Sequence, residues 1–377
     1  MNYEYSQKEF ELFIELYQMV SAYSASHPMD TGGPDCEKNI QRAVEKLAQT
    51  PYLRLGLFDV ENANGLVTLM GAMEVVAAIS PSLYLTAEYS MRLLGRALAE
   101  WGDEKQKEAF LAPLISGSAI GALALCEQTV NVDNESLATT GEKQGDEVII
   151  NGRKQFVVNG PVAKVIGVVG TCDGKPAIFL VDGDAPGLSI NRTEGSFGYK
   201  GAGISEMTLE NCKVDEGRII RCNEKEDMVS VLRLWENQIL TGASLGLMRV
   251  SFENARDYAK SHKTGGKPII AYQEIGFKLA EMLTLFQTSQ MLAIRAAWTA
   301  EKQPREAPDL ALCAKVFCTE SAARVSGDAM NILGSSAYFG ANPVEHAYCC
   351  ARYGESFGTS TELSRVKIGD AALGMKP

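Results

Sequence analysis

Apolar residues change their spacing twice along the chain, and the two changes divide it into three parts. The first third lacks the alternation typical of strands and is broken by short polar segments. This pattern predicts helices over residues 7–25, 40–48, 87–100 and 105–115. Asp103 stands where its side chain can cap the amides at the start of the last of these helices. We expect an N-terminal helical domain over residues 1–118.

The middle third is rich in strand-forming residues. Residues 148–150 and 155–158 flank Asn151-Gly152, a dipeptide typical of tight turns, and therefore predict a hairpin. Further strands are predicted over residues 164–170, 177–181 and 206–214, with a turn at Asp173-Gly174 between the first two. Because no helix is predicted between these strands, we expect an antiparallel sheet or small barrel over residues 119–224.

Helical spacing returns from Met228 onward. Six apolar residues recur at steps of three or four and form an apolar stripe: Leu232, Trp235, Ile239, Ala243, Leu247 and Val250. Further long helices are predicted from Glu274 and over residues 309–333. A second helical domain is therefore expected over residues 225–377, which makes the fold class α+β.

Charge and cysteine content exclude several classes of partner. The net charge of −11 argues against nucleic acid and anionic membranes as partners. No apolar run reaches the roughly 20 residues that a membrane helix needs, and the acidic start lacks the basic region of a signal peptide. The nine cysteines and three histidines show no metal-binding spacing. We expect a cytoplasmic protein without a metal, with reduced and buried cysteines.

Motifs spread along nearly the whole chain carry a family resemblance. They are GDEKQKEAFLAPLISG at residues 102–117, IGALALCEQ at 120–128, FVVNG at 156–160, GASLGLM at 242–248, KTGGKP at 263–268 and GTSTEL at 358–363. In this order they resemble the acyl-CoA dehydrogenase family. The resemblance implies an N-terminal helical domain, a middle β domain and a C-terminal four-helix bundle. It also implies FAD between the β domain and the bundle, and a homotetramer or dimer.

The resemblance also implies a catalytic base. The family's reaction removes an α-proton of a thioester while a hydride passes to the flavin, so a carboxylate must lie over the substrate. Most members place a glutamate directly before the last Gly-Thr-Ser, where this chain has Phe357, expected only to shape the substrate pocket. A minority place it on the bundle helix, six residues before a glycine, which implies Glu236 before Gly242.

The position of Glu236 on the apolar stripe supports the same role, because a buried carboxylate is costly unless it is protonated, paired or functional. A glutamate tilted to a solvated helix edge is the non-catalytic alternative. Glu355, two residues from the usual position, is the alternative base.

The groups that hold FAD are implied residue by residue. The matching positions are Leu125, Cys126, Phe156, Val158, Thr264, Asn331, Gly334, Thr359 and Thr361. Several depart from the family pattern: Cys126 and Val158 replace threonines, and His262 replaces an arginine that meets the cofactor of a neighbouring subunit. Losing an arginine–phosphate pair weakens binding by roughly 1.5–3 kcal/mol. A flavin-free subunit that completes a partner's site is therefore a second hypothesis, and a non-catalytic scaffold is a third.

The substrate end has also lost polar groups. Val132, in the substrate pocket, replaces a loop serine, Leu234 and Asn237 replace a polar pair, and Gly369 replaces an arginine. A CoA nucleotide needs such groups, whereas a carrier protein presents the same pantetheine arm without the nucleotide. The losses suit an acyl thioester on an acyl or peptidyl carrier protein, as in family branches that make hydroxymalonyl- or aminomalonyl-type extender units for polyketides and peptides. Those branches oxidise a carrier-bound aldehyde to the acid, so the resemblance implies that Glu236 would there take a hydroxyl proton of the hydrate instead of an α-proton. A short-chain acyl-CoA is the alternative substrate, and an electron-transfer flavoprotein is the implied electron acceptor.

Overall fold

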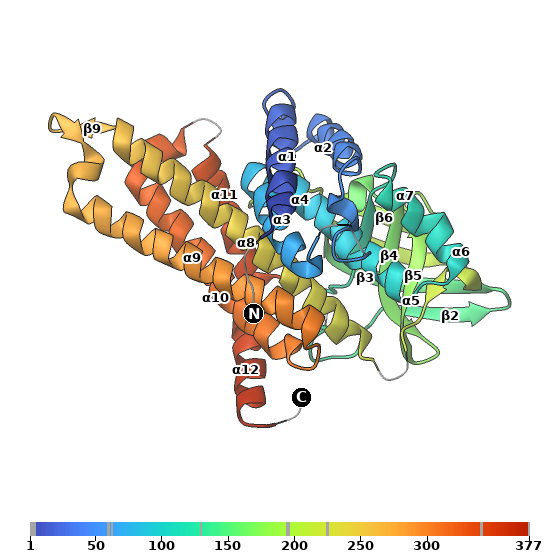
Figure 1. The fold of residues 1–377 in the computed structure, drawn as a ribbon. Coiled ribbons are helices and arrows are strands. Elements are labelled where there is room, and N and C mark those ends of the chain that lie inside the picture. The colour runs from blue at the N-terminus through green and yellow to red at the C-terminus, as the bar shows by residue number, and fades with distance from the viewer. Residues whose placement is uncertain are drawn as a thin grey trace.

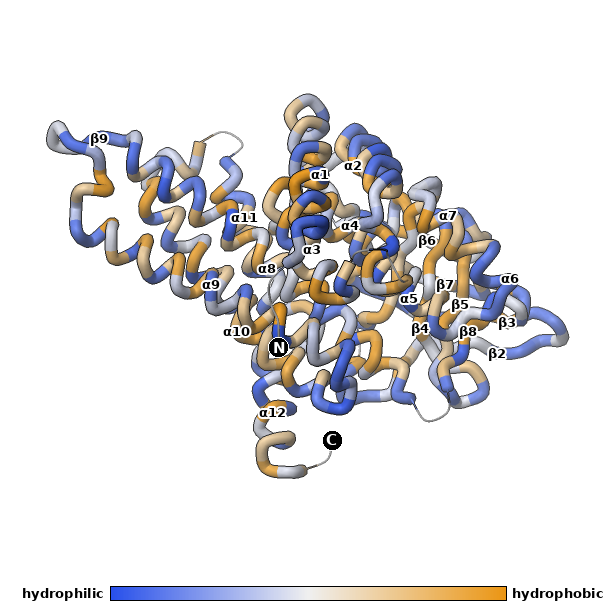
Figure 2. The backbone as a smooth tube through the Cα atoms, viewed as in Figure 1, coloured by the Kyte–Doolittle hydropathy of each residue, from blue (hydrophilic) through white to orange (hydrophobic). Residues whose placement is uncertain are grey.

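The computed structural model describes residues 5–58, 61, 63–128, 130–193, 197–223, 226–339 and 342–375. A layer of N-terminal helices lies between a β-sheet and a group of long C-terminal helices, as Figure 1 shows. Hydrophilic residues gather at the two far tips of the molecule, near β9 and β2 (Figure 2). The three-part α–β–α fold predicted from the sequence is therefore confirmed.

The N-terminal part is helical up to Ile115. Its elements are α1 (Gln7–Ser24), α2 (Pro34–Leu47), α3 (Gly65–Ile79), α4 (Pro81–Glu88), the π-helical turn η2 (Tyr89–Gly95), α5 (Arg96–Trp101), α6 (Glu104–Gln106), the π-helical turn η3 (Lys107–Leu111) and α7 (Ala112–Ile115). Asp103 caps α6 by accepting a hydrogen bond from the Gln106 amide at 2.8 Å, as expected. Helix α3 was not predicted, because it is buried on all sides and lacks a polar face.

The middle part is one eight-stranded sheet. Its strands are β1 (Gly121–Ala124), β2 (Thr140–Gln144), β3 (Glu147–Val157), β4 (Val165–Cys172), β5 (Lys175–Asp182), β6 (Leu188–Arg192), β7 (Ser205–Asp215) and β8 (Ile219–Ile220). They follow the order β6-β7-β3-β2-β4-β5-β8, and β1 pairs with β4. Among these described strands β6 and β8 are the ends of the order, so the sheet is open. Most pairings are antiparallel, as expected, but β1–β4 and β2–β4 are parallel.

The predicted hairpin at Asn151-Gly152 is wrong. Strand β3 runs straight through this dipeptide, and the tight turn lies earlier, at Gly145, whose φ is +64°. Gly152 is needed for a different reason, because a Cβ there would collide with the side chain of Thr139. The pairing of β3 with β7 is irregular between Ile150 and Gly152, which is typical of a glycine in a strand. The predicted turn at Asp173-Gly174 is present between β4 and β5.

The C-terminal part returns to long helices. Its elements are α8 (Met228–Ser261), the short strands β9 (Lys263–Thr264) and β10 (Lys267–Pro268), α9 (Gln273–Lys302), α10 (Ala307–Leu333), α11 (Pro343–Ser356) and α12 (Thr361–Ala372). The apolar stripe of α8 is used inside the chain, where Leu232, Ile239 and Ala243 are buried. Helix α9, by contrast, leaves Phe277, Leu283 and Met291 exposed. None of the described helices is long and apolar enough to cross a membrane.

One polar cluster joins the N-terminal helices to α11. Asp30 accepts hydrogen bonds from the Ser82 amide and the Ser80 hydroxyl at the start of α4, and it lies 3.2 Å from Nε2 of His346. The thiol of Cys350 lies 3.5 Å from the same nitrogen. Burial opposes the charged imidazole, but Asp30 and Cys350 outweigh it and raise the pKa of His346 to about 10. The cluster therefore holds α11, which leads to the turn before α12, against the N-terminal part.

We predict that His346→Gln lowers the free energy of unfolding by on the order of 1–3 kcal/mol at neutral pH, because Asp30 loses its charged partner. A raised folded-state pKa stabilises the fold below the ordinary histidine pKa of about 6.5. This contribution is lost as the pH rises toward about 10. Urea unfolding across this pH range measures the difference between variant and wild type. The exposed His262 supplies the control, His262→Gln. A difference that stays constant up to pH 10 would contradict the pair's role.

Candidate active site

A cleft of about 330 Å³ lies between the β domain and the C-terminal helices, and we call it the β3 cleft. The β domain contributes the loop after β1, including Cys126 and Val132, together with Phe156 from β3. The opposite wall is the turn between α11 and α12, including Phe357 and Gly358. Arg233 reaches the cleft from α8. Long helices and a sheet thus frame a site whose surface comes mainly from two loops.

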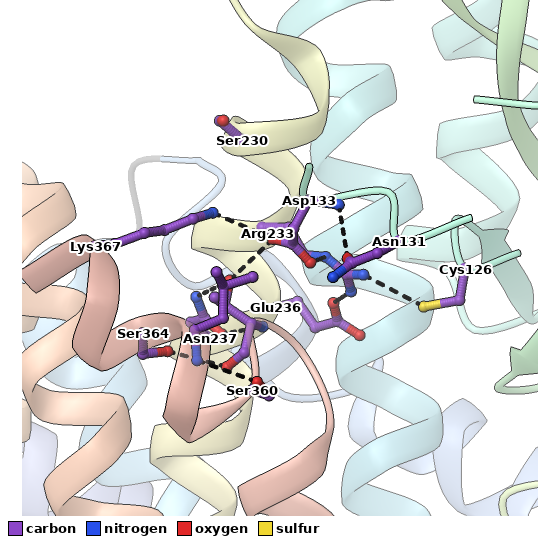
Figure 3. A network of polar contacts seen from close by, with 12 residues as sticks. Cys126, Asn131, Asp133, Ser230, Arg233, Glu236, Asn237, Ser360, Ser364 and Lys367 are labelled. Carbon is purple, nitrogen blue, oxygen red and sulfur yellow. Dashed lines mark hydrogen bonds and ion pairs between the residues drawn. The ribbon is translucent and has the colours of Figure 1, made fainter. Parts of the chain in front are cut away.

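Glu236 lies on α8 beside this cleft and is 6% exposed. Its Oε1 accepts a hydrogen bond from the Tyr89 hydroxyl at 2.8 Å, and its Oε2 accepts one from Nη1 of Arg233 at 2.6 Å. Nε of Arg233 lies 3.1 Å from an Asp133 oxygen, and Nη2 contacts the thiol of Cys126 at 3.5 Å. Figure 3 shows Arg233 between Asp133 and Glu236. The predicted base is therefore a paired carboxylate, not one at a solvated helix edge.

The charges of this cluster follow from burial and proximity. Burial alone would lower the pKa of Arg233, but the Glu236 carboxylate, Cys126 and Asp133 raise it above the ordinary value. Burial and the Glu236 carboxylate raise the pKa of Tyr89 well above its usual range. Burial also raises the pKa of the Cys126 thiol. At neutral pH the cluster therefore holds a guanidinium, a neutral phenol and a neutral thiol around Glu236.

Asn237 and Lys315 fix the turn between α11 and α12. The Asn237 amide accepts a hydrogen bond from the Thr359 amide at 3.0 Å and donates one to the Thr359 hydroxyl at 3.2 Å. A Cβ on Gly358, whose φ is +66°, would lie 2.5 Å from the Asn237 oxygen, so the close approach requires glycine. The buried Lys315 donates to the Glu355 carbonyl at 3.4 Å, and burial lowers its pKa to about 8. The turn is thus tied to both α8 and α10.

Aromatic rings line the cleft on both sides. Phe357 stacks on Tyr353 with ring centroids 3.5 Å apart, and its ring stands edge to face with that of Phe156, with centroids 5.2 Å apart.

On the β side, the buried Lys154 donates to Glu127 at 2.6 Å and to the Leu125 carbonyl at 3.2 Å. This pair holds the end of β1 against β3, because an unpaired buried charge would be costly.

The structure divides the predicted cofactor positions into two groups. Cys126 and Phe156 line the β3 cleft, and four others are buried beside it or in the adjoining turn: Leu125, Val158, Thr359 and Thr361. Thr264, Asn331 and Gly334 are exposed at the other end of α8 and α10, near β9 (Figure 1). The folding of one chain does not bring these three positions to the cleft.

Comparison with known proteins identifies the family. The model of the acyl-CoA dehydrogenase middle domain matches residues 122–212, and that of the C-terminal domain matches residues 234–373. A 3-(aryl)acrylate reductase of Clostridium sporogenes is 31% identical over 88% of this chain and 89% of its own. The chain belongs to the acyl-CoA dehydrogenase family. This family comprises FAD-dependent oxidoreductases, which confirms the predicted enzyme class and cofactor.

Two solved structures share the fold of this acyl-CoA dehydrogenase family member. Butyryl-CoA dehydrogenase of Megasphaera elsdenii superposes with a TM-score of 0.87 at 21% identity, covering 99% of this chain and 100% of its own. The prolyl acyl carrier protein oxidase AnaB superposes with a TM-score of 0.85 at 23% identity, covering 98% and 100%. At these identities the similarity supports the fold alone.

The residues of the β3 cleft fit the family's cofactor. Phe156 and Val132 on the β side and Phe357 on the opposite wall are apolar surfaces suited to a planar ring. Helix α12 begins at the edge of the cleft, where Ser360 is its N-cap. The Leu363 amide donates to the Ser360 hydroxyl at 3.3 Å, and the N-terminus of the helix suits a pyrophosphate. Phe156 and Phe357 touch edge to face, so a planar ring between them requires one to turn.

Sequence reasoning missed the three groups that surround Glu236 and the turn: Arg233, Tyr89 and Lys315. Only Arg233 had a readable signal, because it lies three residues before Glu236 and so on the same helix face. Tyr89 and Lys315 come from distant segments and look like ordinary helix residues in the sequence. Leu234 and Asn237 were read as lost substrate contacts, but Asn237 binds the turn instead.

Proposed function

We propose that this protein is an FAD-dependent dehydrogenase that oxidises an acyl thioester, with Glu236 as the catalytic base. The observation that supports this most strongly is a buried carboxylate beside the aromatic cleft, held by Arg233 and Tyr89. Bound FAD would supply the acceptor for the hydride. Glu236 would take the substrate proton, and Phe357 would exclude water and shape the pocket.

Two alternatives have less support. Glu355, the other candidate base, pairs with the exposed Arg352 at 2.7 Å and is itself only half-buried. In a non-catalytic subunit the cluster around Glu236 would serve only to join parts of the fold, although burying charged groups costs several kcal/mol. Glu236 on α8 is therefore the base that we propose.

We further propose that the acyl group arrives on the pantetheine arm of a carrier protein. A second cleft of about 220 Å³, the α12 cleft, is lined by Arg233, Asn237, Asp309, Lys367 and Asp370 among others. Its two cations face carboxylates: Arg233 contacts Asp133 and Glu236, and Lys367 lies 3.3 Å from Asp133. Such paired cations leave little charge for the phosphates of a CoA nucleotide.

The comparisons lend this proposal limited support. The fold relative AnaB is named as an oxidase of a carrier-bound prolyl group. The reductase from Clostridium sporogenes is named for an arylacrylate, so related chains act on quite different acyl groups. A short-chain acyl-CoA therefore remains the alternative substrate, and an electron-transfer flavoprotein as electron acceptor stays a prediction.

Replacing the base should separate chemistry from cofactor binding. Glu236→Gln keeps the shape of the side chain and removes its basicity, so flavin reduction by substrate should fall by about 10²–10⁴-fold while FAD stays bound. Stopped-flow absorbance measures the reduction, and the flavin spectrum measures occupancy. Phe357→Glu alone should not raise the rate. Combined with Glu236→Gln, it should restore part of the rate, because it places a carboxylate directly before the Gly-Thr-Ser motif. A Glu236→Gln variant that reduces flavin at the wild-type rate would contradict the assignment.

The form of the substrate is tested with one acyl group attached in two ways. We expect faster flavin reduction with the phosphopantetheinylated carrier protein than with the same acyl group on CoA, because the α12 cleft offers no unpaired cation among its described lining residues. Matched anaerobic titrations with each thioester give the two rates. Equal or faster reduction by the CoA form would refute the carrier proposal and leave the proposed base unaffected.

We also propose that the chain associates into a dimer or tetramer. Phe277 and Met291 are exposed on α9, and Thr264, Asn331 and Gly334 lie too far along the helices to reach the cleft of their own chain. Light scattering at micromolar concentration should show a dimer or larger. The double variant Phe277→Asp, Met291→Asp should dissociate more readily, because each introduced charge would be desolvated at a contact. A wild-type monomer would contradict this proposal.

A further inference from the structure

Arg233 separates Glu236 from the solvent-filled space of the site. Its side chain lines both the β3 cleft and the α12 cleft, whereas Glu236 is not among the described lining residues of either. Asp133 lies 3.1 Å from the same guanidinium that Glu236 binds at 2.6 Å. The two carboxylates therefore compete for one cation, and only one of them is the proposed base.

Every element packed around Glu236 contributes to its electrostatic surroundings. Tyr89 approaches from η2, Arg233 from α8 itself, Cys126 and Asp133 from the loop after β1, Lys315 from α10 and Tyr353 from α11. Lys367 from α12 contacts Asp133 and so acts at one remove. Among these groups Arg233 is the cation that hydrogen-bonds Glu236 directly, and Tyr89 donates a hydrogen bond without carrying charge.

We infer that Arg233 is a positioning residue that orients Glu236 and stabilises its negative charge, and that Asp133 weakens this effect by sharing the guanidinium. The inference rests on the proposed function of Glu236 for its catalytic meaning, but its electrostatic content stands on the contacts alone. Burial disfavours an ionised carboxylate, whereas an opposite charge in contact favours it by about one to three pH units. Without Arg233, the buried Glu236 would lose the cation that hydrogen-bonds it directly, and its ionised form would be less stable.

The test uses infrared spectra of the whole protein prepared without flavin. The carbonyl stretch of a protonated Glu236 is assigned as the band that disappears when the substitution Glu236→Gln is added to the same protein. In Arg233→Gln we expect this band to persist to higher pH than in wild type, by about one to three pH units. Arg233→Lys should restore part of the ionised form, because a cation returns without the planar fork that spans two carboxylates. Asp133→Asn should shift the titration the other way, to lower pH.

A matched control is Arg96→Gln. Arg96 pairs with Glu100 at 2.7 Å and lies over the ring of Trp235. The variant therefore removes a partly buried arginine close to α8 that does not contact Glu236. A merely structural loss would affect stability in both arginine variants, but only the Arg233 and Asp133 variants should move the Glu236 band. Identical titrations in wild type, Arg233→Gln and Asp133→Asn would overturn the inference. If Arg233→Gln fails to fold, Asp133→Asn and Arg233→Lys decide it.

The pH profile of flavin reduction in the FAD-loaded protein distinguishes this inference from the proposed function. If Glu236 is the base, the acidic limb of the profile should move by the same amount and in the same direction as the infrared titration in each variant. An infrared shift without a shift in the profile would uphold the role of Arg233 toward Glu236 and contradict Glu236 as the base.

Discussion

A buried guanidinium must be balanced by negative charge, and in this protein that requirement organises the site. Arg233 meets Glu236 on its own helix and Asp133 on the loop after β1, and Asp133 in turn meets Lys367 on α12. One chain of contacts therefore connects the bundle, the β domain and the last helix. Removing a member would leave an uncompensated buried charge, which is far more costly than losing a surface ion pair.

The same helix also fixes the opposite wall of the cleft. Asn237 follows Glu236 directly and holds Thr359 through two hydrogen bonds. These bonds fix the position of the turn relative to the Glu236 carboxylate. Gly358 permits this approach, and Lys315 supports the end of α11 from the other side. With Phe357 in the turn, the chain separates two roles: α8 carries the ionisable group, and the turn supplies an apolar surface.

Periodic patterns predicted the long amphipathic helices and the succession of three parts, because burial of one face leaves a readable spacing. The pattern failed where burial is complete, as in α3, and where glycine serves packing instead of a turn, as at Gly152. Glu236 could be named from the family resemblance, by its place six residues before Gly242, but its partner Tyr89 and the competing Asp133 come from segments far away in sequence. Such long-range polar contacts leave no local periodicity, so only the folded chain reveals them.

The central claim is that proton removal in this protein depends on the α8 carboxylate and not on the turn before α12. The most direct measurement isolates that step from hydride transfer, using a thioester that has an acidic α-hydrogen and no β-hydrogen, such as a carrier-bound arylacetyl group. Exchange of its α-hydrogen in deuterium oxide is followed by NMR with the FAD-loaded protein. The account predicts exchange in wild type and a loss of about 10²–10⁴-fold in Glu236→Gln. Equal exchange in the two proteins would contradict it.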